Sequence, residues 1–229
     1  MRETQALITQ MTSLTADIVC VHLKLAPFIN YQPGQYLQFK HQEQFLSYSI
    51  ANAAQPEELL ELHVRDNPPM RIISFLQQKM FKQQPLTLRL PLGFCHVGCL
   101  HADKPILLIA GGTGFAPIKA MLEYLIHKPI AEVTLIWSVR AVDDLYANEL
   151  VMHWAKKYDF LNYCPMITGA HPERLVDKIL AKKDLMTHQV VIAGPFEMAY
   201  ELRKHLVGAG VGAAYIHADA FEFITQGER

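Results

Sequence analysis

The chain from about residue 104 onward alternates strictly between apolar runs and amphipathic stretches, and this alternation constrains the fold more than any other feature. Runs such as PILLIAG (105–111), EVTLIWSV (132–139) and QVVIAGP (189–195) are typical of parallel strands that are covered on both faces. Helical patterns follow them, among them APIKAMLEYLIHK (116–128) and FEMAYELRKHLVGAG (196–210). Alternating strands and helices predict a doubly wound parallel sheet.

The first part of the chain, up to about residue 98, instead contains short β-rich runs that end in proline, glycine, asparagine or charged residues. ADIVCVHLKL (16–25) alternates like a half-buried strand, and Pro33-Gly34 marks a turn before the next run. Further strands are expected within 36–39, 45–52, 58–65 and 86–93, and one helix within 68–80. Short strands with one helix predict a closed antiparallel barrel, because closure removes exposed strand edges. We therefore expect two domains, 1–98 and 99–229.

Charge and hydropathy exclude several classes of function. The formal net charge is −1, and the basic residues are scattered, so no positive field favours nucleic acid or an anionic membrane. No apolar stretch approaches the ~20 residues that span a bilayer. The first fifteen residues mix charged, amide and apolar side chains, which does not fit a signal peptide. A cytoplasmic location is the resulting expectation.

The cysteines and histidines do not predict a metal or a disulfide framework. Cys20, Cys95, Cys99 and Cys164 form no CxxC motif, and their spacing does not fit a built-in iron–sulfur cluster. We expect inert thiols. The 11 histidines include no HExxH motif or other ligand spacing, so no metal site is predicted.

Two glycine turns follow apolar runs, at the ends of strands where doubly wound sheets bind ligands. The first is GGTG (111–114), and the second is Gly194-Pro195. Glycine lets the backbone turn sharply and approach a ligand, and a following helix offers free N–H groups. The spacing is neither GxGxxG nor a P-loop, so each turn alone can be a nucleotide site or an ordinary tight turn. The pair together favours a crevice.

A third candidate lies in the β-rich half, in FLSYSIANA (45–53). Strand alternation places Tyr48 and Ser49 on opposite faces, so that one residue can pack against a flat ring while the other offers a hydroxyl. An ordinary β-rich strand with polar residues at its end explains the same pattern.

Five motifs then carry a resemblance to a known family. PGQY (33–36), SYSIA (47–51), LPLG (90–93), AGGTGFAP (110–117) and AGPFEMA (193–199) occur in the order seen in the ferredoxin reductase superfamily. The sequence most resembles the bacterial NAD(P)H-flavin reductases, which include those that supply reduced flavin to luciferase. The resemblance extends over essentially the whole chain.

The resemblance implies a six-stranded Greek-key flavin-binding barrel, followed by a nicotinamide-binding α/β domain. It places Ser49 near flavin N5 and Thr113 at the nicotinamide, and these two residues are the implied catalytic groups. The segment SVRAVDDLY (138–146) resembles the one that lies near the adenosine ribose. The implied cofactor contacts are Tyr36, Ser47, Tyr48, Ser49, Ile50, Gly111, Gly112, Thr113, Gly114, Pro117, Ser138, Arg140, Gly194, Pro195, Phe196 and Phe221.

Two residues depart from the superfamily pattern. Leu46 stands where an arginine usually contacts the flavin phosphate, and losing such a donor removes roughly 1.5–3 kcal/mol of interaction. We therefore expect a weakly bound flavin, with riboflavin or FMN favoured over a resident FAD. Ala193 stands where many superfamily members have a cysteine, and the flavin reductases also lack that cysteine. Arg140 alone does not decide between NADH and NADPH.

The sequence thus predicts an NAD(P)H:flavin oxidoreductase, and two alternatives stay open. The chain could be the reductase component of an electron-transfer system, with bound flavin that serves a flavodoxin, an iron–sulfur protein or an oxygenase. It could also be a non-catalytic nucleotide-binding regulatory module. The terminal aromatics, Phe221 and Phe223, either pack against the last strand or return to the flavin face, where Asp219 could line the crevice.

Overall fold

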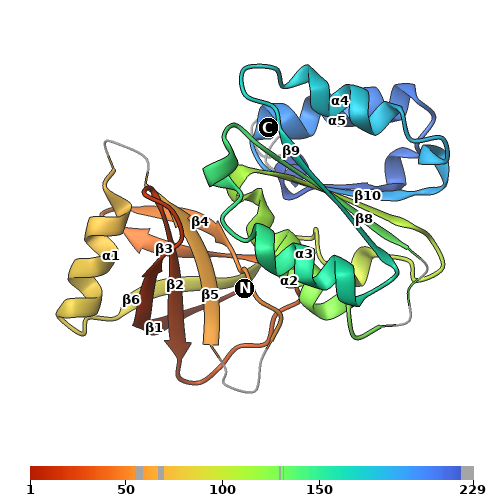
Figure 1. Cartoon of the computed structure of the whole chain (residues 1–229). Coiled ribbons are helices and arrows are strands. Elements are labelled where there is room, and N and C mark those ends of the chain that lie inside the picture. Colours follow the sequence, from red (N-terminus) through yellow and green to blue (C-terminus); the bar gives the residue numbers. More distant parts are fainter. Residues whose placement is uncertain (55–58, 67–69, 129, 131, 223–229) are drawn as a thin grey trace.

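The computed structural model describes residues 1–54, 59–66, 70–128, 130 and 132–222, which form two sheets with their helices (Figure 1). The first sheet is antiparallel, with strand order β4-β3-β6-β1-β2-β5. Its strands are β1 (Arg2–Ser13), β2 (Ile18–Leu25), β3 (Tyr36–His41), β4 (Gln44–Ser49), β5 (Leu59–Arg65) and β6 (Leu86–Leu92). These strands confirm the six-stranded antiparallel architecture.

The six strands form a curled sheet, or half-barrel, rather than a fully closed barrel. The edge strands β4 and β5 approach each other where the isolated bridge Ile50↔Leu62 joins them. Inward-facing aliphatic residues such as Leu23, Leu62 and Leu88 fill the interior and are fully buried. Helix α1 (Ile72–Phe81) packs against this core through Ile72 and Leu76. The helix predicted within 68–80 is therefore confirmed, and among the described residues one isolated bridge joins the two edge strands.

Strand β1 was not predicted from its sequence. Only Ala6 and Ile8 of its twelve residues are buried in the core, and most of the others are exposed. A long polar strand of this kind has no clear apolar alternation, and its place is set by ladders to β2 and β6.

The second sheet is parallel, with strand order β11-β10-β7-β8-β9, as the alternation of strands and helices predicts. Its strands are β7 (Ile106–Gly111), β8 (Val133–Val139), β9 (Leu161–Ile167), β10 (Gln189–Ala193) and β11 (Ile216–His217). The core on one face contains residues of α2 (Phe115–Leu125) and α3 (Asn148–Lys157). The opposite face packs against α4 (Glu173–Leu180) and α5 (Phe196–Gly208), as Figure 1 shows.

The strand order reverses direction at β7. The chain runs outward from β7 through β8 and β9, and it then returns to β10 on the other side of β7. Open α/β sheets bind ligands at this switch point, outside the carboxyl ends of the strands. Both predicted glycine turns follow the two strands at this point. Within the part of the chain that the structure describes, none of the helices is long and apolar enough to cross a membrane.

Candidate functional site

A cavity of about 870 Å³ lies where the carboxyl ends of the parallel strands face the curled sheet. Its volume falls within the roughly 300–1,000 Å³ that is typical of small-molecule sites. Most of the predicted cofactor contacts line it: Tyr36, Ser47, Tyr48, Ser49, Gly111, Gly112, Thr113, Gly114, Pro117, Ser138, Arg140, Gly194, Pro195 and Phe196. Residues that are far apart in the sequence therefore meet at one cavity.

Strand β4 supplies the wall on the side of the curled sheet. The Tyr48 ring stacks on Phe39, with 5.0 Å between ring centroids and 8° between ring planes. Burial raises the pKa of Tyr48 to about 12, so its phenol stays neutral at physiological pH. Ser49 ends the strand and pairs with Tyr36 on β3. This wall therefore offers an aromatic ring and a hydroxyl group next to each other.

The GGTG turn forms the facing wall, and its glycines serve two different purposes. A Cβ atom on Gly114 would collide with the backbone of Ala193 and Gly194, so this glycine lets the two turns pack together. Gly112 has a φ of +54°, and a Cβ atom there would meet nothing within 4 Å. The carbonyl oxygen of Gly112 accepts a 3.0 Å hydrogen bond from Trp137 Nε1. Gly114 thus lets this turn pack closely against the second turn, and Gly112 leaves open space in front of α2.

The second glycine turn lies beside the first because β7 and β10 are neighbours, with Ala110 paired to Ala193. Gly194 and Pro195 lead into α5, and Phe196 opens that helix with 53% of its surface exposed. The crevice wall that was expected from the paired turns is present in the geometry.

The cavity extends outward to the end of β8. Ser138 is buried, and its Oγ lies 3.4 Å from Thr168 Oγ1. Thr168 in turn donates a 3.2 Å hydrogen bond to the carbonyl oxygen of Val139. Arg140 is exposed at the rim. Sequence reasoning missed Thr168, although it ends a run, LNYCPMIT (161–168), that has the pattern of a strand.

Asp219 also lines the cavity, near the wall that β3 contributes. It accepts a 3.2 Å hydrogen bond from the backbone N–H of Cys95. Burial is the main cause that raises the pKa of this carboxyl to about 7, and the nearby Glu222 raises it further. Asp219 is therefore an ionisable group in the cavity that can exchange a proton near neutral pH.

Two predicted contacts are absent from the cavity lining of the described chain. Ile50 is fully buried in the core of the curled sheet, and its N–H donates to the carbonyl oxygen of Gln35. Phe221, in the short 3-10 turn Asp219–Glu222, packs against α5, where its ring centroid is 5.5 Å from that of Tyr200. This packing favours the structural interpretation of Phe221, and Phe223 lies outside the described residues. The contacts of Ile50 and Phe221 with a cofactor stay predictions.

The cationic residues of the cavity bear on phosphate binding. Leu46 packs against the core of the curled sheet and does not line the cavity. Among the described lining residues, the arginines are Arg65 and Arg140. Arg65 is already engaged, because its Nη2 lies 2.7 Å from Asp144 Oδ1 and its Nε lies 3.2 Å from Asp17 Oδ2. Sequence reasoning also missed Arg65 as a lining residue.

An ionic cluster holds α2 against the outer face of the curled sheet. Lys119 Nζ lies 2.6 Å from Glu123 Oε1 and 3.2 Å from Glu61 Oε2, and it donates a 3.1 Å hydrogen bond to the carbonyl oxygen of Ala51. Glu123 also accepts a 2.9 Å hydrogen bond from the N–H of Ala53. Burial by itself would lower the pKa of Lys119, but the two carboxylates outweigh burial and raise it.

Comparison with known proteins fits this geometry. A family model described as the oxidoreductase NAD-binding domain matches residues 108–204. The chain is 33% identical to a Yersinia pestis CDP-6-deoxy-L-threo-D-glycero-4-hexulose-3-dehydrase reductase, over 90% of this chain and 64% of that protein. It is 27% identical to a probable flavin reductase of Photobacterium leiognathi, over 94% of this chain and 97% of the relative.

A solved structure agrees in fold. The crystal structure of an Amycolatopsis cytochrome P450 reductase matches with a TM-score of 0.81 and 24% identity, over 95% of this chain and 69% of that chain. The first curated relatives are longer, since the chain spans between 48% and 66% of their length. The chain belongs to the ferredoxin reductase-like superfamily, as its ordered motifs predicted.

Proposed function

We propose that the protein is an NAD(P)H-dependent flavin reductase, which transfers a hydride from a reduced nicotinamide to a weakly bound flavin. The observation that carries the proposal is the single cavity in which Tyr48 and Ser49 face the two glycine turns at the switch point. The relative described as a probable flavin reductase, which aligns over 97% of its length, supports this choice.

The donor set of the cavity suits two flat heteroaromatic ligands. Tyr36 and Tyr48 would hold the flavin ring, while Gly112 and the turn at 194–196 would leave space for the nicotinamide. Ser138 and Arg140 would lie near the adenosine ribose. When bound, the flavin supplies a ring that accepts the hydride and carries the electrons onward.

The protein's own groups position and polarise these ligands. The Ser49 hydroxyl donates a hydrogen bond to the edge of the flavin ring, where charge increases during reduction. Thr113 orients the nicotinamide amide, and α2, which begins at Phe115, directs the positive end of its dipole toward the ligand. The walls of the cavity shield the reacting rings from bulk water.

We expect weak flavin binding because the described residues that line the cavity offer no unpaired cationic side chain near β4. Leu46 offers no charge, and Arg65 is paired with Asp144 and Asp17. The protein should therefore bind riboflavin about as well as FMN or FAD. We also propose the two-domain division at 1–98 and 99–229, with Val97–Cys99 as the connection. A cytoplasmic location stays a prediction.

The test is oxidation of NADH and of NADPH by the purified protein, with and without added riboflavin, FMN or FAD. Turnover should need an added flavin, and the protein as isolated should contain far less than one flavin per chain. One tightly bound FAD per chain would contradict weak binding. No stimulation by any flavin would contradict the activity itself.

A second candidate is the reductase component of an electron-transfer chain. Relatives described as reductase components of Comamonas terephthalate 1,2-dioxygenase favour it, with 30% identity over 92% of this chain. Cytochrome c reduction distinguishes the two functions. A flavin reductase should reduce it only when free flavin is present, whereas a reductase component with bound flavin should not depend on added flavin. A non-catalytic module would give no turnover in either assay.

A further inference from the structure

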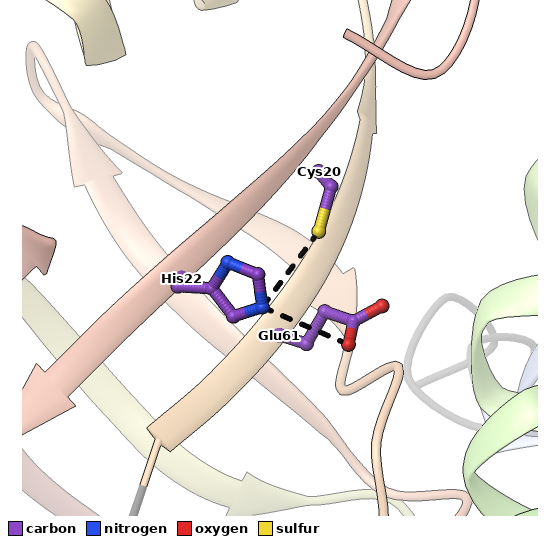
Figure 2. Close-up of side chains that lie close together, drawn as sticks. All are labelled: Cys20, His22 and Glu61. Carbon is purple, nitrogen blue, oxygen red and sulfur yellow. Dashed lines mark hydrogen bonds and ion pairs between the residues drawn. The ribbon is translucent and has the colours of Figure 1, made fainter. Parts of the chain in front are cut away.

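Three side chains of different chemistry converge on the outer face of the curled sheet, where α2 covers it. Cys20 and His22 are two residues apart on β2, so they lie on the same face of that strand. Glu61 on β5 is the register partner of His22. Figure 2 shows the thiol, the imidazole and the carboxylate directed toward a common point.

The distances between the ligand atoms are close to those of a metal centre. Cys20 Sγ lies 4.0 Å from His22 Nε2, and His22 Nε2 lies 3.9 Å from Glu61 Oε2. All three atoms lie within 4.8 Å of one another. A tetrahedral zinc site with ordinary bond lengths separates its ligand atoms by about 3.4–3.6 Å. Rotamer adjustments that bring the atoms modestly closer would therefore complete the geometry.

We propose that Cys20, His22 and Glu61 bind a single divalent transition-metal ion, with Zn²⁺ as the best match and water as the fourth ligand. Sulfur and imidazole ligands together select zinc and related metals rather than Mg²⁺ or Ca²⁺. The sequence predicted no metal, because the ligands come from two strands that are distant in the chain and form no local motif.

Neighbouring groups support the ligands as an outer shell. His63 Nε2 lies 2.7 Å from Glu61 Oε1, while Glu61 Oε2, which lies 3.2 Å from Lys119 Nζ, is the oxygen directed at the cluster. Tyr146 OH lies 2.9 Å from His63 Nδ1 and fixes that ring in turn. These contacts hold Glu61, whereas the Nδ1 of His22 has no hydrogen-bond partner among the described residues. Such second-layer contacts orient metal ligands and strengthen binding.

The charges of the cluster favour a divalent cation despite the neighbouring lysine. Lys119 carries +1, while Glu61 and Glu123 each carry −1, so these three groups sum to −1. Binding M²⁺ adds +2, and loss of the Cys20 proton adds −1, which brings the sum to zero. Lys119 is held by three acceptors and keeps Glu61 in place.

Binding is a ligand exchange without any redox step. The S–H bond of Cys20 breaks, a sulfur–metal bond forms, and the proton passes to the buffer. A second cavity, of about 570 Å³, reaches the Glu61 side of the cluster, where Glu61, His63 and Lys119 line it. The metal would join β2 to β5 at the contact with α2, so its role is structural rather than catalytic.

Cobalt provides the direct test, because Co²⁺ bound to a thiolate has a charge-transfer band in the near ultraviolet that surface histidines do not produce. The wild-type protein should develop this band, saturate it at one equivalent of Co²⁺, and lose it when Zn²⁺ is added. Cys20→Ser should abolish the band. Cys99→Ser and Cys164→Ser, which remove thiols outside the cluster, should retain it. His22→Ala should weaken Co²⁺ binding by at least about tenfold.

The absence of the band in the wild-type protein would overturn the proposal, as would its persistence in Cys20→Ser. A second measurement guards against misfolded variants: Zn²⁺ should raise the Tm of the wild-type protein, and a chelator should reverse the rise. An unchanged wild-type Tm at saturating Zn²⁺ would count against the site. Neither measurement involves flavin or nicotinamide, so the result is independent of the proposed reductase activity.

Discussion

Ser49 and Asp219 are the two polar side chains of the cavity whose effects can be separated most clearly. Ser49 ends β4 beside the stacked pair of Tyr48 and Phe39, so its position is set by a strand and an aromatic contact. The Asp219 carboxyl accepts a hydrogen bond from the N–H of Cys95, and burial raises its pKa. Ser49 is therefore expected to act through a hydrogen bond, and Asp219 through its charge.

Replacing Ser49 with alanine should lower the kcat for flavin reduction about 10- to 100-fold, because a hydrogen bond to developing charge is lost. The Tm should change little, since the hydroxyl supports no other described residue. Steady-state kinetics with riboflavin measure the effect. Ser74→Ala, on the exposed side of α1, is the matched control and should behave like the wild type. Equal kcat values for the two variants would remove Ser49 from the catalytic machinery.

Asp219 should make the protein less stable as pH rises from about 4 to 7. Its pKa is raised in the folded state, so in this window the unfolded chain has released a proton that the folded chain retains. A shift from the ordinary value to about 7 corresponds to up to about 4 kcal/mol of lost stability above pH 7. Asp219→Asn should flatten the pH dependence of Tm in this window. An unchanged pH profile would show that the carboxyl titrates normally.

Among the elements, the two strand-to-helix turns of the parallel sheet determine the shape of the site. The turn at 111–114 packs against the turn at 194–196 because Gly114 has no side chain. The same turn opens toward the cavity at Gly112. Within this one motif, Gly114 therefore allows the two turns to pack closely, and Gly112 leaves space for a ligand.

Two glycine variants should show this difference. Gly114→Ala should cost more than about 2 kcal/mol of folding free energy, since the new Cβ would force the turns apart. Gly112→Ala should cost about 1 kcal/mol, because only its positive φ is penalised. Urea unfolding measures both values. A Gly112 variant that is less stable than the Gly114 variant would contradict the assignment of their roles.

The parallel half was predictable because its strands are covered on both faces, which produces continuous apolar runs between helices. Strand β1 was not, since only Ala6 and Ile8 of its residues are buried in the core. The glycine turns follow strand ends that the sequence locates, whereas Ser49, which was expected inside a strand at 45–52, ends β4. Thr168 and Arg65 reach the cavity through the packing of whole elements, which periodicity cannot reveal.

The arrangement of the two halves of the molecule depends on the contacts that fix the curled sheet against α2. Lys119 bridges Glu61 on the curled sheet and Glu123 on its own helix, and that helix begins directly after the GGTG turn. The separation of the two cavity walls is therefore linked to this cluster. A change far from the reacting rings can alter the transfer of a hydride.

Lys119→Met should lower stability by about 3–5 kcal/mol, because two half-buried carboxylates lose their cation. It should also lower kcat/KM for the reduced nicotinamide, whereas Lys204→Met on the exposed side of α5 should affect neither quantity. Chemical unfolding and steady-state kinetics measure the two effects. Wild-type stability in Lys119→Met would show that the cluster does not hold the two halves together.

The central claim is that one cavity brings a nicotinamide and a free flavin into contact for direct hydride transfer. Anaerobic stopped-flow mixing of the protein and riboflavin with reduced nicotinamide tests it, with loss of flavin absorbance as the signal. We predict that the protein accelerates this loss far above the uncatalysed rate, and that deuterium at the transferred position of the nicotinamide slows it. A rate equal to that of riboflavin and nicotinamide without protein would contradict the claim.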